Sequence, residues 1–178
     1  MIPNLRILSD VTRTFAINEE NTFLKRMRHI FIELDNIDAD VLNKYSGIDP
    51  GTAKLGIVDG NHLCEIEIIR ADTSERRIHH IWRLLRLIML PNIKYMTIEG
   101  ASYMDRYRQV ELQDIRCGAT CWAMNDSRNI EVQIVPPLTI RKVVFGSAKI
   151  KNPWKELGIP DNAAAALGCA LYPIMKGK

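Results

Sequence analysis

The sequence has no long apolar run, no closely paired cysteines and no strong charge of either sign. Its 178 residues carry 24 Lys and Arg against 21 Asp and Glu, a formal net charge of +3 at pH 7. Only a local basic patch could therefore attract nucleic acid. The four cysteines form no CxxC pair, which predicts reduced thiols. No segment has the length of a membrane span, and the early acidic residues are unlike a signal peptide. We therefore expect a cytoplasmic α/β protein that does not act in a membrane.

The chain divides into a short extension and one core domain. A 47% hydrophobic content without low-complexity tracts is ordinary for a globular protein of this length. Residues 1–45 predict a mainly helical N-terminal extension, because Asn21 can cap a segment with apolar residues at helical spacing. From Tyr45 onward the apolar residues follow strand-like spacing. We therefore predict that residues 46–178 form the core domain.

The sequence pattern of residues 46–178 predicts the element order βββ-α-β-α-β-α. A turn at Asp59 and Gly60 joins two alternating strands. Helices are expected at 74–90, about 106–124 and about 162–173, strands at 95–98 and 130–135, and a loop before the last helix. This is the order of the ribonuclease-H-like fold, a mixed β-sheet flanked by helices. Other small α/β domains share much of this order, so it predicts the fold only weakly.

Two acidic residues end apolar strands and are candidate metal ligands. Asp49 precedes Pro50 and Gly51, although Asp-Pro-Gly is also ordinary turn chemistry. Glu99 ends the predicted strand at 95–98, where a charge is seldom chosen for packing. Phosphodiester hydrolysis commonly uses carboxylates that hold two divalent cations about 4 Å apart. By contrast, we assign Asp59 to the hairpin turn, and Asp105 and Asp114 to helix surfaces.

A third acidic position opens the Ala-rich segment at 159–171. Asp161 lies where a helix N-cap belongs, so capping alone could explain it.

Five segments, taken in order, resemble the motifs of the RuvC-type Holliday junction resolvases. They are residues 46–51 (Ser-Gly-Ile-Asp-Pro-Gly), 97–100 (Thr-Ile-Glu-Gly), 108–118 with an Arg-x-Gly step, 146–149 (Gly-Ser-Ala-Lys) and 161–168 (Asp-Asn-Ala-Ala-Ala-Ala-Leu-Gly). The resemblance covers about residues 46–174, and no single motif is specific alone. It implies a homodimeric endonuclease that cuts four-way DNA junctions with two Mg²⁺ or Mn²⁺ ions per site.

The last motif departs from the pattern that it otherwise resembles. The family has an aspartate before Ala166 and Leu167, where this chain has Ala165. We predict that an Asp→Ala change at 165 makes the chain inactive; a natural Ala-rich helix is the alternative. The resemblance implies that Asp49, Glu99, Asp161 and the residue at 165 hold the metals. Asp161 is favoured because it lies one turn from 165, but the motif register points to Asn162.

Further residues are expected to contact DNA. The resemblance places a lysine near the scissile phosphate, which Lys149 would supply, with Lys151 close by. It also places the segment after Glu99 at the junction centre, where aromatic side chains can stack on bases. Arg76, Arg83 and Arg86 could follow a phosphate backbone. A solvated loop would explain Lys149 equally well, helix packing is the alternative for Tyr107, and a solvated helix face is the more common meaning of such arginines. The candidates after Glu99 are Tyr103, Met104, Arg106, Tyr107 and Arg108.

Three functions remain open. The leading one is a resolvase of four-way or branched DNA. The second is a nuclease of the same fold that acts on RNA–DNA hybrids. The third is a non-catalytic junction-binding protein in which Ala165 is natural.

Overall fold

The computed structural model describes residues 6–7, 44–60, 62–68, 71–89, 92–101, 108–125, 129–149 and 160–177. The helix expected after Asn21 lies outside these residues, as do Tyr103, Met104, Arg106, Tyr107 and Lys151. The domain boundary at residue 45 therefore stays a prediction.

The described residues form a mixed six-stranded sheet in the order β1-β4-β3-β2-β5-β6. Neighbours from β1 to β2 pair antiparallel, whereas β2, β5 and β6 run parallel. The two-residue β1 lies inside the segment predicted as a helical extension and pairs with β4. The strands are β1 (Arg6–Ile7), β2 (Tyr45–Pro50), β3 (Lys54–Asp59), β4 (His62–Glu67), β5 (Tyr95–Glu99) and β6 (Glu131–Val135).

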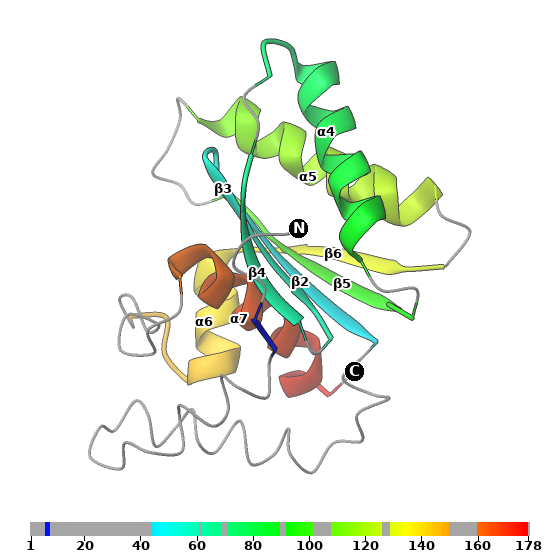
Figure 1. Ribbon diagram of the computed structural model, residues 1–178. Coiled ribbons are helices and arrows are strands. Elements are labelled where there is room, and N and C mark those ends of the chain that lie inside the picture. Colours follow the sequence, from blue (N-terminus) through cyan, green and yellow to red (C-terminus); the bar gives the residue numbers. More distant parts are fainter. Residues whose placement is uncertain are drawn as a thin grey trace.

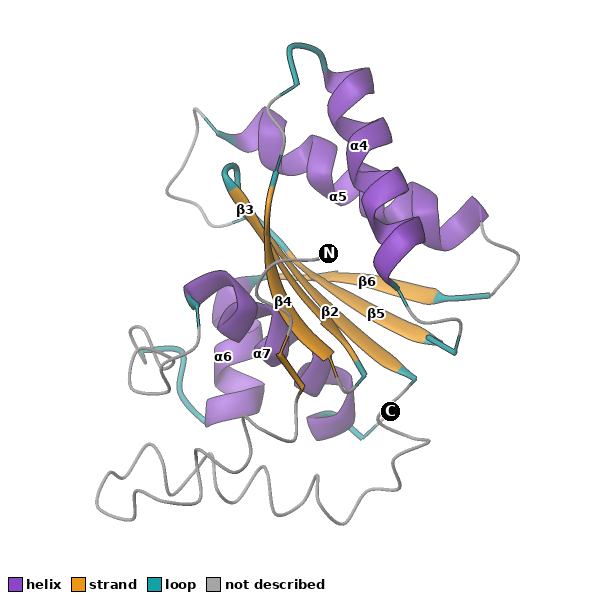
Figure 2. Ribbon diagram, viewed as in Figure 1, coloured by secondary structure: helices purple, strands orange, loops and turns teal. Residues whose placement is uncertain are grey.

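Helices of the described part of the chain cover both faces of the sheet (Figure 1, Figure 2). On one face lie α4 (Ser74–Ile88) and α5 (Gln109–Asn125). On the other lie α6 (Pro137–Phe145) and α7 (Asp161–Met175). None of the helices in the described part of the chain is long and apolar enough to cross a membrane.

Helix α6 corrects the sequence analysis, which expected a loop between the last strand and the last helix. Pro137 occupies the first turn, and Gly146 ends the helix with a left-handed φ of 72°, a combination typical of helix boundaries. Between them, Ile140 and Val144 are buried at helical spacing. These start and stop signals were present in the sequence but the short helix was missed.

Local signals explain the other elements. The side chain of Thr73 accepts a hydrogen bond from the backbone N–H of Arg76 and so caps α4. Ile81 and Leu85 of α4 are buried, as the predicted apolar stripe requires. Gly60, with φ of 54°, turns the chain between β3 and β4, which confirms the predicted hairpin.

Asp114 corrects a second expectation, because it is buried and not on a helix surface. Its carboxylate accepts a hydrogen bond from the guanidinium of Arg77, so it joins α5 to α4. Arg77 also donates to the carbonyl of Ala71 at 3.0 Å. The pair therefore satisfies two charges that burial would otherwise penalise.

Helix α7 packs directly on the backbone of the central strands. A Cβ added to Gly47 of β2 would lie 2.0 Å from the carbonyl oxygen of Ala166. A Cβ added to Gly56 of β3 would lie 1.9 Å from the carbonyl oxygen of Asn162. Glycine at both positions lets the helix approach the sheet closely, which places the first turn of α7 against the ends of β2 and β3.

Candidate active site

Asp49 and Glu99 lie at the carboxyl ends of adjacent parallel strands. Ile48 of β2 is paired with Ile98 of β5, so the two acidic residues follow at the same level of the sheet. Gly47 faces α7, and side chains alternate along a strand. Asp49 therefore faces α7 as well. This geometry confirms that the two predicted carboxylates come from adjacent strands.

Burial makes this carboxylate pair electrostatically unfavourable in the absence of a cation. Burial raises the pKa of Asp49 well above its usual value, and the charge of Glu99 raises it further. Burial also raises the pKa of Glu99, whereas Arg141 and Arg116 oppose that rise. Two nearby carboxylates with raised pKa values are typical of functional sites.

Arg116 supports the pair from the α5 side of the sheet. Its Nε donates a hydrogen bond to the carbonyl oxygen of Glu99 at 2.9 Å. The residue is only 5% exposed, and burial lowers the pKa of its guanidinium while Glu99 and Asp49 raise it. Arg116 belongs to the Arg-x-Gly step of the resemblance, although sequence reasoning gave it no role.

Arg141 of α6 approaches the carboxylates from the opposite side of the sheet. Its charge opposes the raised pKa values of both Glu99 and Asp49. Sequence reasoning missed this residue because α6 was taken for a loop. The predicted cation, Lys149, is exposed in the turn after α6, where its backbone N–H donates to Ser147 Oγ at 3.2 Å.

Asn162 of α7 lies against the start of strand β3. Its Nδ2 donates to the carbonyl oxygen of Lys54 at 3.4 Å. Asp161 is exposed at the first residue of the helix. The hydrogen bond of Asn162 to β3 supports the alternative that the motif register suggested, and the choice between the two residues stays a prediction.

Cys169 shows which side of α7 faces the carboxylates. The residue is fully buried, and burial followed by the charges of Glu99 and Asp49 raises the pKa of its thiol. Backbone hydrogen bonds with Ile48 and Glu99 oppose that rise. Ala165 lies one helical turn before Cys169 on the same face. Sequence reasoning did not single out Cys169, because nothing in its own neighbourhood marks it.

Ala165 itself lies outside the hydrophobic core. It is half-buried, whereas its neighbours Ala164 and Ala166 are fully buried in the cluster between α7 and the sheet. This position fits the expectation that residue 165 faces the carboxylates.

The donor set fits a hard divalent cation only in part. Mg²⁺ binds oxygen ligands and is commonly held by one or two carboxylates, with water and phosphate completing its shell. Asp49 and Glu99 provide two such carboxylates. Among the residues that the structure describes, no group of three or more His, Cys, Asp or Glu could hold a metal. With alanine at 165, Asp161 is the one acidic residue within α7, and it is exposed at the first residue of the helix.

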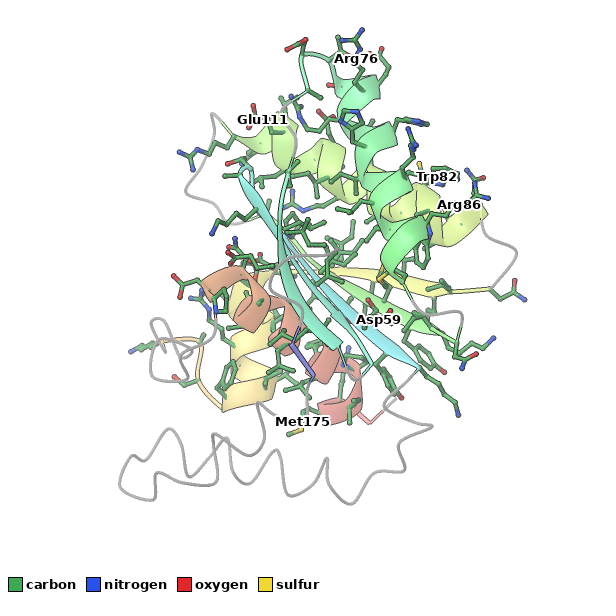
Figure 3. All side chains as sticks on the ribbon, in the orientation of Figure 1. Asp59, Arg76, Trp82, Arg86, Glu111 and Met175 are labelled. Carbon is green, nitrogen blue, oxygen red and sulfur yellow. The ribbon has the colours of Figure 1, made fainter. Side chains whose placement is uncertain are left out.

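Of the other candidate DNA contacts, those that the structure describes lie on the α4 and α5 side. Arg108 is exposed and lines a pocket of about 440 Å³ with Arg77 and Glu111. Arg86 lies over the ring of Trp82, 5.4 Å from its centre, and Figure 3 shows both side chains on α4. The predicted basic side of α4 is exposed at Arg76, Arg83 and Arg86.

Solved structures relate this arrangement to a known fold. No protein-family profile and no curated protein sequence matches the chain. The structure of Thermus thermophilus RuvC matches with a TM-score of 0.59 at 17% identity, over 73% of this chain and 92% of that chain. T. thermophilus RuvC in complex with a Holliday junction substrate gives a TM-score of 0.53 at 15% identity, over 74% and 92%. The chain therefore has the ribonuclease-H-like fold of RuvC, as the sequence motifs predicted.

Proposed function

We propose that this protein is a structure-selective DNA endonuclease of the RuvC type, which resolves four-way or branched DNA junctions. The observation that carries the proposal is the meeting of Asp49 and Glu99 at adjacent strand ends, beside the first turn of α7. Paired carboxylates at a sheet edge suit metal-assisted phosphodiester hydrolysis. The RuvC fold and the junction substrate bound to one of the similar structures support the choice of DNA.

The residues of the site divide into metal ligands and phosphate contacts. Asp49, Glu99 and an acidic residue at 165 would hold two Mg²⁺ or Mn²⁺ ions, with the side chain of Asn162 or Asp161 as the remaining ligand. Bound metal would activate water and neutralise charge on the phosphate. Arg141, whose charge acts on both carboxylates, would bind the same phosphate, and Lys149 would contact the strand further along. The role of Arg116 is to hold the Glu99 backbone in place.

Alanine at 165 would leave this chain able to bind DNA but nearly unable to cut it. Loss of one ligand weakens a metal position and leaves Asp49 and Glu99 repelling each other. Affinity for DNA comes mainly from phosphate contacts with Lys and Arg, which the change at 165 does not touch.

We also propose that two copies act together, because nicks in opposing strands call for two sites related by a two-fold axis. Part of α5 is available for pairing. Ile115 and Trp122 are used in the core, but Val110 and Met124 are 65% and 76% exposed. With Cys121, which is also exposed, they lie at spacings that share one helix face.

The test is to measure cleavage of a synthetic four-way junction by the Ala165→Asp variant and by the chain as it stands. We expect Ala165→Asp to accelerate Mg²⁺-dependent cutting by roughly 1000-fold or more, because a metal ligand stabilises the transition state by several kcal/mol. Junction affinity, measured by fluorescence anisotropy, should not rise with it. Ala165→Asn is the matched control, since it adds the volume without the charge.

Each substrate separates one alternative. Cutting of junctions but not of linear duplexes or RNA–DNA hybrids supports the proposal, whereas cutting of hybrids supports the second function. Junction binding without cutting by Ala165→Asp supports the non-catalytic protein. Efficient Mg²⁺-dependent cutting by the Ala165 chain would show that residue 165 is not a required ligand.

A further inference from the structure

A second charged pair lies beside the carboxylates, on β3 and β4. Lys54 Nζ is 2.8 Å from Glu65 Oε1, and the two side chains differ sharply in exposure: 47% for Lys54 and 7% for Glu65. The carboxylate is therefore held inside the protein, while about half of the lysine side chain is exposed at the surface.

Sheet register places this pair at the level of the active site. Asp49 of β2 is paired with Gly56 of β3, and Gly56 is paired with Glu65 of β4. Side chains that are paired across a sheet share one face. Glu65 therefore faces α7 like Asp49, and Gly56 between them has no side chain. The charge of Glu65 is close enough to raise the pKa of Asp49 further.

Helix α7 connects the same strand to the candidate ligands. The carbonyl oxygen of Lys54 accepts the hydrogen bond from Asn162, in the turn that also carries Ala165. Lys54 thus begins β3 at the rim of the site, next to α7. Arg141 reaches the carboxylates from α6. The negative centre therefore has one cation on its β3 side and another on its α6 side.

Stability does not explain why Glu65 is buried here. A half-exposed ion pair contributes little, about 0–1 kcal/mol. A third carboxylate near Asp49 is unfavourable, and the neighbouring inward residue of β4, Leu63, shows that an apolar side chain fits this face. A buried charge where an apolar side chain would fit, next to a candidate site, is a sign of functional constraint.

We infer that Lys54 binds a backbone phosphate of the DNA strand held at Asp49 and Glu99, and that the buried carboxylate of Glu65 positions its ammonium group. This inference rests on the proposed function. A strand of DNA entering a carboxylate site must be held by cations at its rim, because phosphates and carboxylates repel each other. Lys54 is held in place for that contact before DNA arrives.

The experiment measures junction affinity of the Ala165 chain, with a metal chelator present, at several salt concentrations. Lys54→Gln should weaken binding roughly 5-fold near physiological salt and lower the slope of log affinity against log salt by about 1, the value of one phosphate contact. Lys54→Arg should retain the slope. Lys94→Gln is the matched control, because it removes an exposed lysine at the opposite end of β5 and should change neither quantity.

Glu65→Gln and the double variant separate a phosphate contact from simple charge balance. If Lys54 only neutralises Glu65, the Lys54→Gln and Glu65→Gln double variant should regain the parent affinity and slope. We expect it to keep the reduced slope. Glu65→Gln alone should weaken binding about 2-fold with the slope unchanged, although it removes a negative charge. Tighter binding would overturn the positioning role of Glu65.

Junction binding by the parent protein shows whether the Lys54 inference alone fails or the proposed function fails with it. A parent that binds junctions while Lys54→Gln keeps its affinity and slope overturns the role of Lys54 and leaves the proposed function intact. A parent that binds no junction DNA overturns both.

Discussion

The two helical layers pack on the same sheet in different ways. On the α4 and α5 face, large side chains such as Trp122, Leu85 and Ile81 are fully buried. On the α7 face, alanines meet strand glycines, and helix backbone lies against strand backbone. A larger buried side chain removes more apolar surface from water than a buried alanine does, so each such residue on the first face contributes more to stability. Close approach on the second face brings α7 to the carboxylates, which lets it complete a site.

This difference indicates a division of labour between the layers. The α4 and α5 layer would mainly set stability, and the α7 layer would mainly set catalytic geometry. Arg116 is the exception, because it reaches from α5 to the backbone of Glu99. The comparison therefore predicts which changes cost activity and which cost folding free energy.

The largest effect is expected from Gly56→Ala in the Ala165→Asp background. The added Cβ would lie 1.9 Å from the carbonyl oxygen of Asn162, so the first turn of α7 must move. A displacement of about 1 Å at a catalytic site costs roughly 100-fold in rate. Single-turnover cleavage of a four-way junction measures the loss.

Gly118→Ala provides the contrast from the other layer. Its Cβ would lie 2.8 Å from the carbonyl oxygen of Ile78, in the α4 and α5 contact. In the same Ala165→Asp background, we expect a lower melting temperature. The cleavage rate at saturating DNA should stay within about threefold of the rate of the Ala165→Asp protein without the glycine change. An equal loss of rate in the two glycine variants would contradict the division between the layers.

A smaller effect, on stability alone, is expected from Asp114→Ala. The change leaves the guanidinium of Arg77 without its buried carboxylate. We expect a loss of about 2 kcal/mol in the free energy of unfolding, below the usual 3–5 kcal/mol of a fully buried pair because both side chains keep some exposure. Urea denaturation measures the loss, and in the Ala165→Asp background the rate of cutting should not change.

Glu111→Ala is the matched control for that pair. Glu111 Oε1 is 4.0 Å from Arg77 Nη2, and the Glu111 side chain is 48% exposed. Figure 3 labels Glu111 on α5. Its removal should cost less than about 0.5 kcal/mol. A larger loss for Glu111→Ala than for Asp114→Ala would show that burial does not decide the strength of this cluster.

The last expected effect is a pH-dependent gain in stability for Asp49→Asn. The pKa of Asp49 is raised in the folded protein, so the folded state binds its proton more tightly than the unfolded state does. The associated stability is present below the ordinary value of 3.8 and is lost as pH rises through the raised pKa. Without divalent cations, Asp49→Asn should therefore melt higher at pH 7.5, by about 2–4 °C for each 1 kcal/mol.

An exposed aspartate on the α4 side, Asp72, provides the control for the pH dependence of Asp49→Asn. The advantage of Asp49→Asn should shrink toward pH 4, where the parent carboxyl is protonated. Asp72→Asn is the control, because Asp72 is 91% exposed and pairs only loosely with Arg76. A pH-independent gain for Asp49→Asn would mean that packing, not ionisation, explains it.

Local sequence pattern was sufficient for the strands from β2 to β6, for the long helices and for the placement of two acidic residues at adjacent strand ends, but it missed β1. Asp49 and Glu99 were identified because each ends an apolar strand, and parallel strands that follow this order end at the same sheet edge. Local pattern wrongly predicted Asp114 to lie on a helix surface, because helical spacing does not show that Arg77 of another helix contacts it.

The sequence by itself determined the fold class and the carboxylate pair, because strand period, turn chemistry and motif order are carried by neighbouring residues. Only the tertiary structure decided what surrounds that pair. Three different elements supply its neighbours, namely Arg141, Glu65 and Cys169. Strand register and the close approach of α7 to Gly56 bring these residues near the carboxylates. Side-chain spacing along a chain specifies a face, but contact across faces is set by packing.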